Sequence, residues 1–410
     1  MIEIPETRTS YWVDSFQTPD YPQLNGELTV DVVIVGAGIV GLTSAYLLKQ
    51  AGLTVAVIEK NYIGSGVTGY TTGKISSQHN LIYAKLAREH GLETAKVYGQ
   101  ANQAALNQIT TIVTAEQIDC NWRREDSYVY TTQTSQLQKF HEEVDAARAC
   151  GLPVSFETET DLPFTIAGAV KFEHQASFHS RKYLAGLAKR IHGDGSYVFE
   201  SSKVISINSG HPPHVSTLEG KVFARDVIVA TNIPTHPLAA RATYAASVYP
   251  QQSYIVAGRM PTDLHGMYIS PDSGQYSILP VYGDDGAWLF IGGEGHIPGT
   301  RWNAETRYKR LADYARKHFG VEDIEYTWSH RDYLGYDDMP LIGRLYPWSK
   351  HMWTATGFMK WGLTNGTVAG MILSDLVQGR ANPWATTFST LRPQPVLSIP
   401  KVVAEKLSSS

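Results

Sequence analysis

The chain has 410 residues, which is too many for one small core, so we expect two closely connected domains. A hydrophobic content of 43% and a net charge of −4, with no run of Lys and Arg, exclude a disordered protein and a basic binder of nucleic acid or membrane surfaces. Cys120 and Cys150 are the only cysteines, so the sequence excludes a disulfide framework and four-cysteine zinc or iron–sulfur sites, and it favours a reducing compartment.

The N-terminal segment lacks the pattern of a secretory signal. Residues 1–10 contain charged side chains and Pro5 instead of an apolar core. The uncharged stretch 32–48 could be mistaken for a membrane span, but Gly36, Gly38 and Gly41 interrupt it. We therefore expect a cytoplasmic protein with no membrane span.

A dinucleotide-binding fingerprint comes next. The predicted elements are a strand over 29–35, a glycine turn over 36–41, a helix over 39–50 and a strand over 54–59. The turn reads G-x-G-x-x-G between a strand and a helix, which is the context that this motif needs. Gly36 allows the tight turn, Gly38 lets the backbone approach a pyrophosphate, and Gly41 lets helix and strand pack closely. The free N–H groups at the helix start would then bind the phosphates.

Glu59 ends the second strand of this unit. A carboxylate there can accept hydrogen bonds from both ribose hydroxyls and would repel a 2′-phosphate, so NADP is not expected. The alternative is a glycine-rich turn in an α/β domain that binds no nucleotide.

The remaining elements alternate along the chain. The segment 81–150 has a helical pattern, including 81–90 and 136–149. Strand patterns occur at 197–200, 203–207, 214–218, 221–223 and 226–230, with a hairpin turn at Glu219-Gly220. Residues 245–328 indicate further strands with one helix over 304–319, and the segment 338–379 ends in a helix.

Three further segments favour FAD over NAD, because the fingerprint alone fits both cofactors. The small-residue loop 64–74 can wrap around a pyrophosphate and approach a flat ring. The strand ending at 227–232 delivers a small-residue turn to the nucleotide edge. The glycine-rich segment 355–366 opens a helix whose positive dipole end would stabilise the negative charge of a reduced flavin. Each segment alone could be an ordinary loop.

These residues resemble a known family, the D-amino-acid oxidase, glycine oxidase and sarcosine oxidase superfamily of FAD-dependent oxidoreductases. The most specific resemblance lies in Asp338-Met339-Pro340-Leu341-Ile342-Gly343 followed by 355–366. A closer resemblance is to the bacterial branch in which such a flavin domain is fused to a Rieske domain, on residues 71–75, 78–79, 81–83 and 382–384. The residues after Arg392 contain no cysteine or histidine, so no Rieske part is expected in this sequence and the electron acceptor is left open.

The resemblance implies a flavin that oxidises a C–N bond by accepting a hydride, while the protein orients and desolvates an uncharged amine. Arg331 falls near the arginine with which family members grip a substrate carboxylate, and His330 could take its place. An ion pair of Arg331 with Asp332, Asp337 or Asp338 is the alternative. Lys360 could face the substrate side or the pyrimidine end of the flavin, or be a surface lysine.

The other candidates are weaker. Tyr254, Tyr276 and His296 lie on the expected substrate-domain sheet and could line the pocket, although a core or surface position is the favoured reading for each of them alone. His79 could approach the flavin, and covalent attachment through it is not expected. His211 and His214 resemble a metal pair, but without a third ligand we expect a solvated loop and no metal.

We therefore predict an α/β protein with a Rossmann-type FAD-binding domain and an interleaved α+β substrate domain built on an antiparallel sheet. The expected domains are an N-terminal arm (1–28), an FAD-binding domain (29–80, 151–235 and 335–385), a substrate domain (81–150 and 236–334) and a C-terminal tail (386–410). The residues expected to contact FAD are Gly36, Gly38, Ile39, Val40, Gly41, Glu59, Lys60, Gly66, Thr71, Thr72, Gly73, Lys74, Val204, Ala230, Thr231, Gly357, Phe358, Lys360, Trp361, Gly362, Leu363 and Thr364.

The sequence is compatible with three functions. The first is an oxidase that acts on a small amine or amino acid and uses O2. The second is a dehydrogenase or electron-transfer subunit that passes electrons to a separate redox partner. The third is a non-catalytic nucleotide-binding protein.

Overall fold

The computed structural model describes residues 4–261, 263–299 and 303–393. Two compact units are formed, and each is assembled from three separate pieces of chain. The first unit comprises the described residues of 1–17, 69–180 and 251–331, and the second comprises those of 18–68, 181–250 and 332–410. The fold is thus an interleaved α/β architecture, with a Rossmann-type domain and a second domain built on a largely antiparallel sheet.

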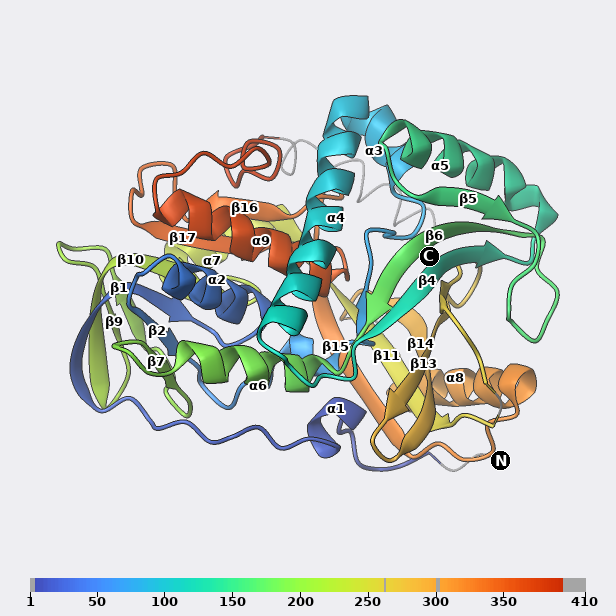
Figure 1. Cartoon of the computed structure of the whole chain (residues 1–410), viewed down its shortest axis with the longest axis horizontal. Helices are drawn as coiled ribbons and strands as arrows, with labels where there is room; N and C mark the ends of the chain where they lie inside the picture. Colours follow the sequence, from blue (N-terminus) through green and yellow to red (C-terminus); the bar gives the residue numbers. More distant parts are fainter. Residues whose placement is uncertain (1–3, 262, 300–302, 394–410) are drawn as a thin grey trace. The chain divides into compact units, whose positions relative to one another are not determined.

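The second unit is built on a mainly parallel sheet with the order β16-β17-β10-β1-β2-β7 (Figure 1). Its elements are β1 (Gly26–Val35), α2 (Ile39–Gln50), β2 (Val55–Ile58), α6 (Ser180–Ile191), β7 (Tyr197–Phe199), β8 (Ser206–Asn208), β9 (His214–Ser216), β10 (Gly220–Val229), α7 (Leu238–Ser247), β16 (Leu341–Arg344), β17 (Met352–Thr356) and α9 (Gly362–Val377).

Strand β1 is the centre of this sheet because its C-terminal half is apolar on both faces. It pairs in parallel with β2 on one side and with β10 on the other, and β10 in turn pairs in parallel with β17. Helices α2 and α9 lie side by side (Figure 1). A Cβ atom at Gly366 would come within 2.6 Å of the Ile39 side chain, so glycine allows this close helix contact. The carboxyl ends of β1, β10 and β17 therefore meet beside the first turns of both helices.

The first unit carries a sheet with the order β15-β11-β14-β13-β12-β4-β6-β3. Its elements are α1 (Tyr11–Asp14), β3 (Lys74–Ile75), α3 (Tyr83–His90), α4 (Leu92–Ala115), β4 (Arg123–Thr131), α5 (Leu137–Ala149), β5 (Val154–Glu157), β6 (Gly168–Ser177), β11 (Val248–Arg259), β12 (Met267–Ile269), β13 (Ser277–Gly283), β14 (Gly286–His296), α8 (Ala304–Phe319) and β15 (Tyr326–Gly335), and the short 3-10 turns are Val67–Tyr70 and Thr134–Gln136.

Alternating residues of β11 pack into different hydrophobic clusters, because successive side chains of a strand point to opposite faces. Tyr254 and Val256 join the cluster beneath α8, whereas Ile255 and Ala257 join a cluster with Trp12 and other aromatic residues. Both faces of this sheet are therefore covered within the first unit.

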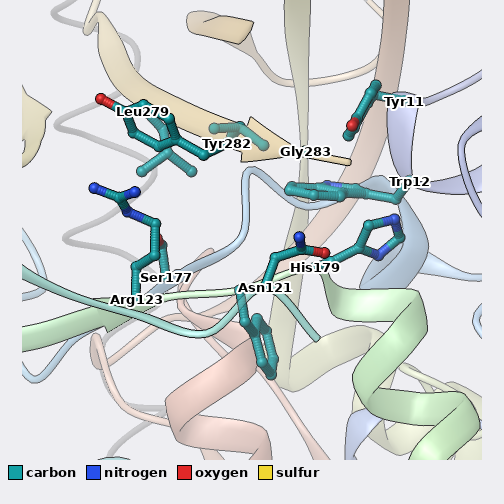
Figure 2. Close-up of a pocket in the computed structure, with 11 residues that line it drawn as sticks. Tyr11, Trp12, Asn121, Arg123, Ser177, His179, Leu279, Tyr282 and Gly283 are labelled. Atoms are coloured by element: carbon teal, nitrogen blue, oxygen red, sulfur yellow. The ribbon is translucent and has the colours of Figure 1, made fainter. Parts of the chain in front are cut away.

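A small cavity lies in the first unit among side chains that include Trp12, Arg123, His179 and Tyr282 (Figure 2). The Arg123 guanidinium stacks on the Tyr282 ring at 3.8 Å from its centroid. The cavity volume is about 10 Å³, enough for a single water molecule. This cavity is therefore too small to hold an amine or amino-acid substrate.

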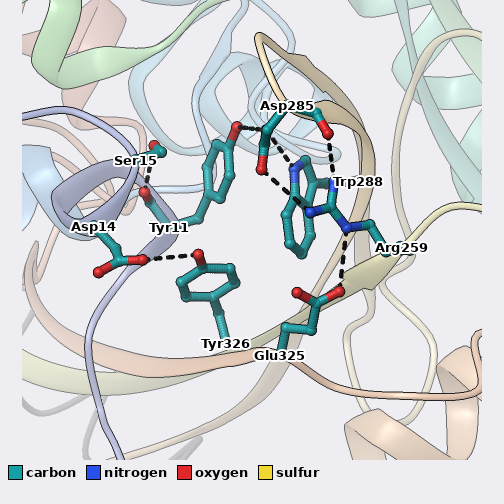
Figure 3. Close-up of polar contacts among 8 residues, drawn as sticks. All are labelled: Tyr11, Asp14, Ser15, Arg259, Asp285, Trp288, Glu325 and Tyr326. Atoms are coloured by element: carbon teal, nitrogen blue, oxygen red, sulfur yellow. Dashed lines mark hydrogen bonds and ion pairs between the residues drawn. The ribbon is translucent and has the colours of Figure 1, made fainter.

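The N-terminal arm is anchored to the first unit by polar contacts (Figure 3). Tyr11 Oη donates to Asp285 Oδ1 at 2.9 Å, and Tyr326 Oη donates to Asp14 at 2.8 Å. The buried Trp12 side chain adds apolar contact area to the same face. These contacts hold residues 11–14 of the arm against the first unit.

Several element predictions are correct and others are wrong. Helices α2 and α8 have the predicted bounds, and the turn at Glu219-Gly220 joins the antiparallel strands β9 and β10. The expectation of a helical pattern throughout 81–150 is wrong, because β4 forms there and pairs with β6 and β12. The segments 221–223 and 226–230 were expected as separate strands, but β10 runs through both.

Candidate functional site

The glycine turn of the second unit has the geometry that its sequence predicts. Gly36 has a φ of +108°, which L side chains rarely adopt, and a Cβ there would lie 2.6 Å from the Ala230 carbonyl oxygen. A Cβ at Gly41 would lie 1.9 Å from the Gly36 carbonyl oxygen. Both glycines are therefore required for the backbone path itself, and the path leaves a side-chain-free surface at the start of α2.

Glu59 is buried against this turn. Its carboxylate accepts from the Ala37 amide at 2.9 Å, from the Asn61 amide at 3.0 Å and from Ser65 Oγ at 3.3 Å. These bonds hold the end of β2 to the glycine turn. The carboxylate thus has the position at the second strand end where a ribose hydroxyl is bound in dinucleotide sites.

The first turn of α2 offers its N–H groups to a ligand. The N-cap residue Gly38 has no side chain that could cap the helix, and the first helical bond runs from the Leu42 amide to the Gly38 carbonyl at 3.0 Å. Thr68 Oγ1 accepts from the Ile39 amide at 3.2 Å and lies 3.3 Å from a Cβ built at Gly38. This hydroxyl stands where a phosphate oxygen would meet the helix N-terminus.

The turn after β10 completes the same edge of the sheet. The Ala230 amide donates to the Val35 carbonyl at 2.9 Å, and Asn232 has a φ of +66°. Thr356 Oγ1, at the end of β17, donates to the Asn232 carbonyl at 2.5 Å. The ends of β1, β10 and β17 are therefore tied together by hydrogen bonds.

The segment before α9 has an unusual backbone. Gly357, Met359 and Lys360 have φ values of +76°, +54° and +68°, all in the left-handed region. Left-handed conformations in residues other than glycine cost about 1–2 kcal/mol each and cluster at functional sites. The Trp361 amide donates to the Phe358 carbonyl at 2.8 Å, and the side chain of Trp361, the N-cap residue of α9, makes no capping hydrogen bond.

The second unit thus fits the adenosine and pyrophosphate parts of FAD. Backbone amides at the starts of α2 and α9, a carboxylate at the second strand end and a glycine turn lie at the carboxyl edge of one sheet. Among the other residues expected to contact FAD, Lys60 and Gly66 are exposed, and Val204, Leu363 and Thr364 are buried. Thr231 is half-buried and donates to the Ile233 carbonyl at 2.8 Å.

Lys360 is half-buried in the strained segment. Burial lowers the pKa of its amine, and the negative charge of Asp332 opposes this effect. The amine is therefore less firmly protonated than that of a surface lysine. Asp332 is buried, with 8% of its surface exposed, and so its carboxylate acts on Lys360 with little screening by water.

The loop that follows Thr68 continues in the first unit. Trp12 Nε1 donates to the Thr71 carbonyl at 2.6 Å. Gly73 has a φ of +95°, and a Cβ there would come within 2.9 Å of the Phe178 carbonyl oxygen. His79 is buried, with Tyr98 Oη at 2.6 Å from Nδ1 and the Ser76 carbonyl at 2.7 Å from Nε2. Burial lowers the pKa of His79 to about 3, so the imidazole is neutral at ordinary pH.

The candidate substrate residues have different surroundings in the structure. Tyr254 Oη lies 3.0 Å from His296 Nε2, so these two side chains come together. The Tyr276 ring stacks on Tyr314 of α8, with centroids 3.7 Å apart. Arg331 is exposed and forms no ion pair within the described ranges. The alternative partner Asp337 is held instead by Arg392, with Nε–Oδ2 and Nη2–Oδ1 distances of 2.7 and 3.0 Å.

Sequence reasoning missed Thr68 and the effect of Asp332 on Lys360. Thr68 lies inside the small-residue loop, so its position among glycines was an available signal. The clamp of Arg392 on Asp337 was also missed, although Arg392 also donates to the carbonyls of Met339 and Pro340. It fixes the turn that carries the Asp338–Gly343 motif.

The part of the chain that the structure describes holds neither a membrane-spanning helix nor a metal-binding group of side chains. None of its helices combines the length and the apolar character needed to cross a membrane. Within the same ranges, no group of three or more His, Cys, Asp or Glu side chains could hold a metal ion.

Comparisons with known proteins agree on one family. Residues 31–376 match the family described as FAD dependent oxidoreductase. YhfW of Bacillus subtilis, named as a Rieske 2Fe-2S iron-sulfur protein, is 33% identical over 392 residues, which are 95% of this chain and 76% of that protein. The gamma-glutamylputrescine oxidoreductase of Escherichia coli is 25% identical over 389 residues, 92% of this chain and 90% of that protein. The structure of glycine oxidase from Geobacillus kaustophilus has a TM-score of 0.76 at 22% identity and covers 89% of this chain and 99% of its own.

Proposed function

Because this chain belongs to the FAD-dependent oxidoreductase family, we propose that it oxidises a C–N bond of a small amine or amino acid. Bound FAD would accept the hydride at N5, and the imine product would then hydrolyse. The observation that carries this proposal is the joint arrangement of the Gly36–Gly41 turn and the strained Phe358–Gly362 segment at one edge of the parallel sheet, each at the start of a helix.

We assign FAD binding to the second unit and contacts with the substrate to the sheet of the first unit, which refines the domain boundaries expected from the sequence. The glycine turn and the start of α2 would bind the pyrophosphate, and Glu59 would bind the ribose. The Phe358–Gly362 segment and the start of α9 would support the negative charge that the flavin ring acquires on reduction.

Arg331 is our candidate for binding a substrate carboxylate. Its guanidinium forms no ion pair in the part of the chain that the structure describes, so it is available for a bidentate contact. His330 is the alternative at this place. Lys360 would face the substrate or the flavin with an amine that burial has made easier to deprotonate. Tyr254, Tyr276 and His296 would contribute the wall of the pocket.

Two relatives support an amine or amino acid as substrate. The names of gamma-glutamylputrescine oxidoreductase and glycine oxidase each specify a compound with an amino group. These relatives match 92% and 85% of this chain, so the likeness is not confined to the nucleotide-binding turn. The two names support a class of substrate, a small amine or amino acid, and our proposal names that class.

The test is an anaerobic screen in which amines, N-substituted glycines and amino acids are mixed with the purified yellow protein. Loss of the flavin absorbance with one compound class supports the proposal, and the released imine should be recovered as a carbonyl product and ammonia or an amine. Arg331→Gln should raise the KM for a carboxylated substrate, whereas Arg148→Gln, on the exposed helix α5, should not. An unreduced flavin across the whole panel would contradict the proposal.

A second candidate function is a dehydrogenase that passes electrons to a separate protein. It is favoured by the likeness to YhfW, whose name includes a 2Fe-2S cluster, and to D-amino acid dehydrogenase of Vibrio atlanticus. Admitting air to the reduced protein distinguishes the two. If the yellow colour returns quickly and hydrogen peroxide is formed, the protein is an oxidase. If the colour returns slowly, the protein is a dehydrogenase.

A further inference from the structure

A cleft of about 380 Å³ lies in the second unit, on β1 and β10. Its walls are formed by residues of these two strands, by the loop before β9 and by His351, which precedes β17. Its volume is within the range of pockets that bind small molecules. None of the described residues that line it belongs to the glycine turn or to the segment before α9, so the cleft is separate from the proposed FAD site.

The cleft forms where β10 changes its partner along one edge. Up to Phe223 the strand pairs with β9, and the Ala224 amide donates to the Pro213 carbonyl at 3.0 Å. From Val227 onward it pairs with β17, and the Val227 amide donates to the His351 carbonyl at 2.9 Å. The two partners therefore diverge between these contacts, and the cleft opens there.

A buried carboxylate orients two basic side chains of the cleft. Asp226 has 2% of its surface exposed, and it accepts from Arg225 Nε at 2.7 Å, from His351 Nδ1 at 3.2 Å and from Trp353 Nε1 at 3.0 Å. Because Arg225 is held through Nε, its two terminal nitrogens form a fork that has no hydrogen bond within the described ranges. In the neutral imidazole that donates from Nδ1, Nε2 is an acceptor.

An acidic side chain lies beside the Arg225 guanidinium. The parallel register of β1 and β10 places Asp31 opposite Arg225. Asp31 Oδ2 accepts from the Thr54 amide and from Thr54 Oγ1, both at 2.8 Å. In the part of the chain that the structure describes, Asp31 and Arg225 form no ion pair with each other, because each is held by a different partner. The cleft thus presents a positive and a negative group side by side.

The rest of the wall is largely apolar. Phe223, Pro212 and Pro213 line the cleft, with Phe223 half-buried and Pro213 buried. These side chains offer contact area to the apolar part of a ligand and no hydrogen-bonding group.

The histidines of this region do not form a metal centre. His211 lines the cleft, whereas the His214 ring lies 5.3 Å from the Phe223 ring between centroids. Within residues 4–261, 263–299 and 303–393, no group of three or more His, Cys, Asp or Glu side chains could hold a metal ion. The ligand that fits the cleft is therefore an organic molecule.

We propose that this cleft binds a free amino acid with an apolar side chain, at a site additional to the one where the flavin would act. The Arg225 fork would bind the carboxylate with two parallel hydrogen bonds. Asp31 and His351 Nε2 would accept from the ammonium group, and Phe223 and the two prolines would contact the side chain. Inorganic phosphate is not expected to bind, because the Asp31 carboxylate repels a multivalent anion.

The experiment is a calorimetric titration of the FAD-loaded protein with both enantiomers of phenylalanine, leucine and methionine. The flavin is first reduced with dithionite under anaerobic conditions, so no amino acid can be oxidised during the measurement. We expect at least one of these compounds to bind saturably, and its amine without the carboxylate and its 2-oxo acid without the amino group to bind at least about tenfold more weakly. No saturable binding up to about 10 mM, or equally tight binding of inorganic phosphate, overturns the proposal.

Variants assign the binding to the cleft. Arg225→Gln should weaken the binding at least about tenfold, whereas Arg241→Gln, on the exposed face of α7 in the same unit, should not change it. Arg331→Gln should also leave it unchanged. Loss of the binding in Arg331→Gln with no change in Arg225→Gln would place the ligand in the substrate site and overturn the proposal.

Asp31→Asn distinguishes recognition of the ammonium group from a structural role. The amide oxygen of asparagine can still accept both hydrogen bonds from Thr54, so this variant also serves if Arg225→Gln does not fold. We expect the amino acid to bind about tenfold more weakly and the 2-oxo acid, which has no ammonium group, to bind no more weakly than to the wild type. An equal loss for both compounds, or no loss for the amino acid, overturns the proposal. All variants are first checked for FAD content and circular dichroism, and the titration requires no turnover, so its outcome is independent of the proposed function.

Discussion

Replacing Lys74 by methionine should remove a pH dependence from the stability of this protein. The folded protein holds Lys74 with a pKa of about 7, whereas the unfolded chain restores the ordinary value near 10.5. Between these two values the unfolded chain binds one more proton than the folded protein at this residue. The free energy of unfolding therefore rises with pH in this window and falls as the pH drops toward the folded pKa.

The magnitude follows from the size of the shift. Each pH unit in the window changes the free energy of unfolding by about 1.4 kcal/mol, so the change from about pH 7.5 to about pH 9.5 is roughly 2.5 kcal/mol. Lys74→Met loses this contribution, and the wild type should gain about that much stability relative to the variant over the same interval. The variant also loses the hydrogen bonds of the buried Lys74 amine to the Tyr268 carbonyl and Ser277 Oγ. This loss changes the difference in free energy of unfolding between the two proteins by a constant and does not change how that difference varies with pH.

The assay is urea unfolding of the FAD-loaded proteins at several pH values, with the wild type and Lys74→Met compared at each pH. Lys171→Met is the control, because hydrogen bonding to Asp126 raises the pKa of Lys171 above the ordinary value. Lys171 is therefore protonated in this window in both the folded protein and the unfolded chain. A difference between the wild type and Lys74→Met that does not change with pH would refute the reasoning. The same slope in Lys171→Met would refute it as well.

The remaining predictions concern the cofactor site and the turn before β16. Gly41→Ala places a Cβ 1.9 Å from a backbone oxygen, so the turn must move, and equilibrium titration should give an FAD affinity at least about tenfold weaker. Glu59→Gln keeps the shape but removes the charge, and the same titration should give a loss of about 10–100-fold. Arg392→Met removes the guanidinium from the Asp337 carboxylate, whose side chain is 0% exposed, and denaturant unfolding should give a loss of about 3–5 kcal/mol. Arg380→Met, which breaks an exposed pair, should cost less than about 1 kcal/mol and is the control for charge removal.

The glycine turn over residues 36–41 could be predicted because its constraints are local. The turn that Gly36 forms and the approach of helix to strand at Gly41 depend on residues within one short segment. The apolar strand before the turn and the acidic residue after it lie within the same βαβ unit. For this reason the observed bounds of α2 are those predicted from the sequence.

The features that could not be predicted depend on partners far away in the sequence. Strand β4 forms because β6 and β12 pair with it, and neither partner is visible in its own residues. Arg392 clamps Asp337 across 55 positions, and Lys74 meets Ser277 across 203 positions. A sequence pattern gives no register between such segments, so the burial and protonation of Lys74 emerged only from the structure.

The most direct test of this account is the identity and amount of flavin released from the purified protein. The protein as isolated should be yellow, and denaturation should release one FAD per chain, identified by chromatography against FAD and FMN. The Gly41→Ala variant should lose most of this flavin while keeping its fold by circular dichroism. A colourless wild-type protein that cannot be loaded with FAD, or one that releases a nicotinamide dinucleotide instead, would contradict the account.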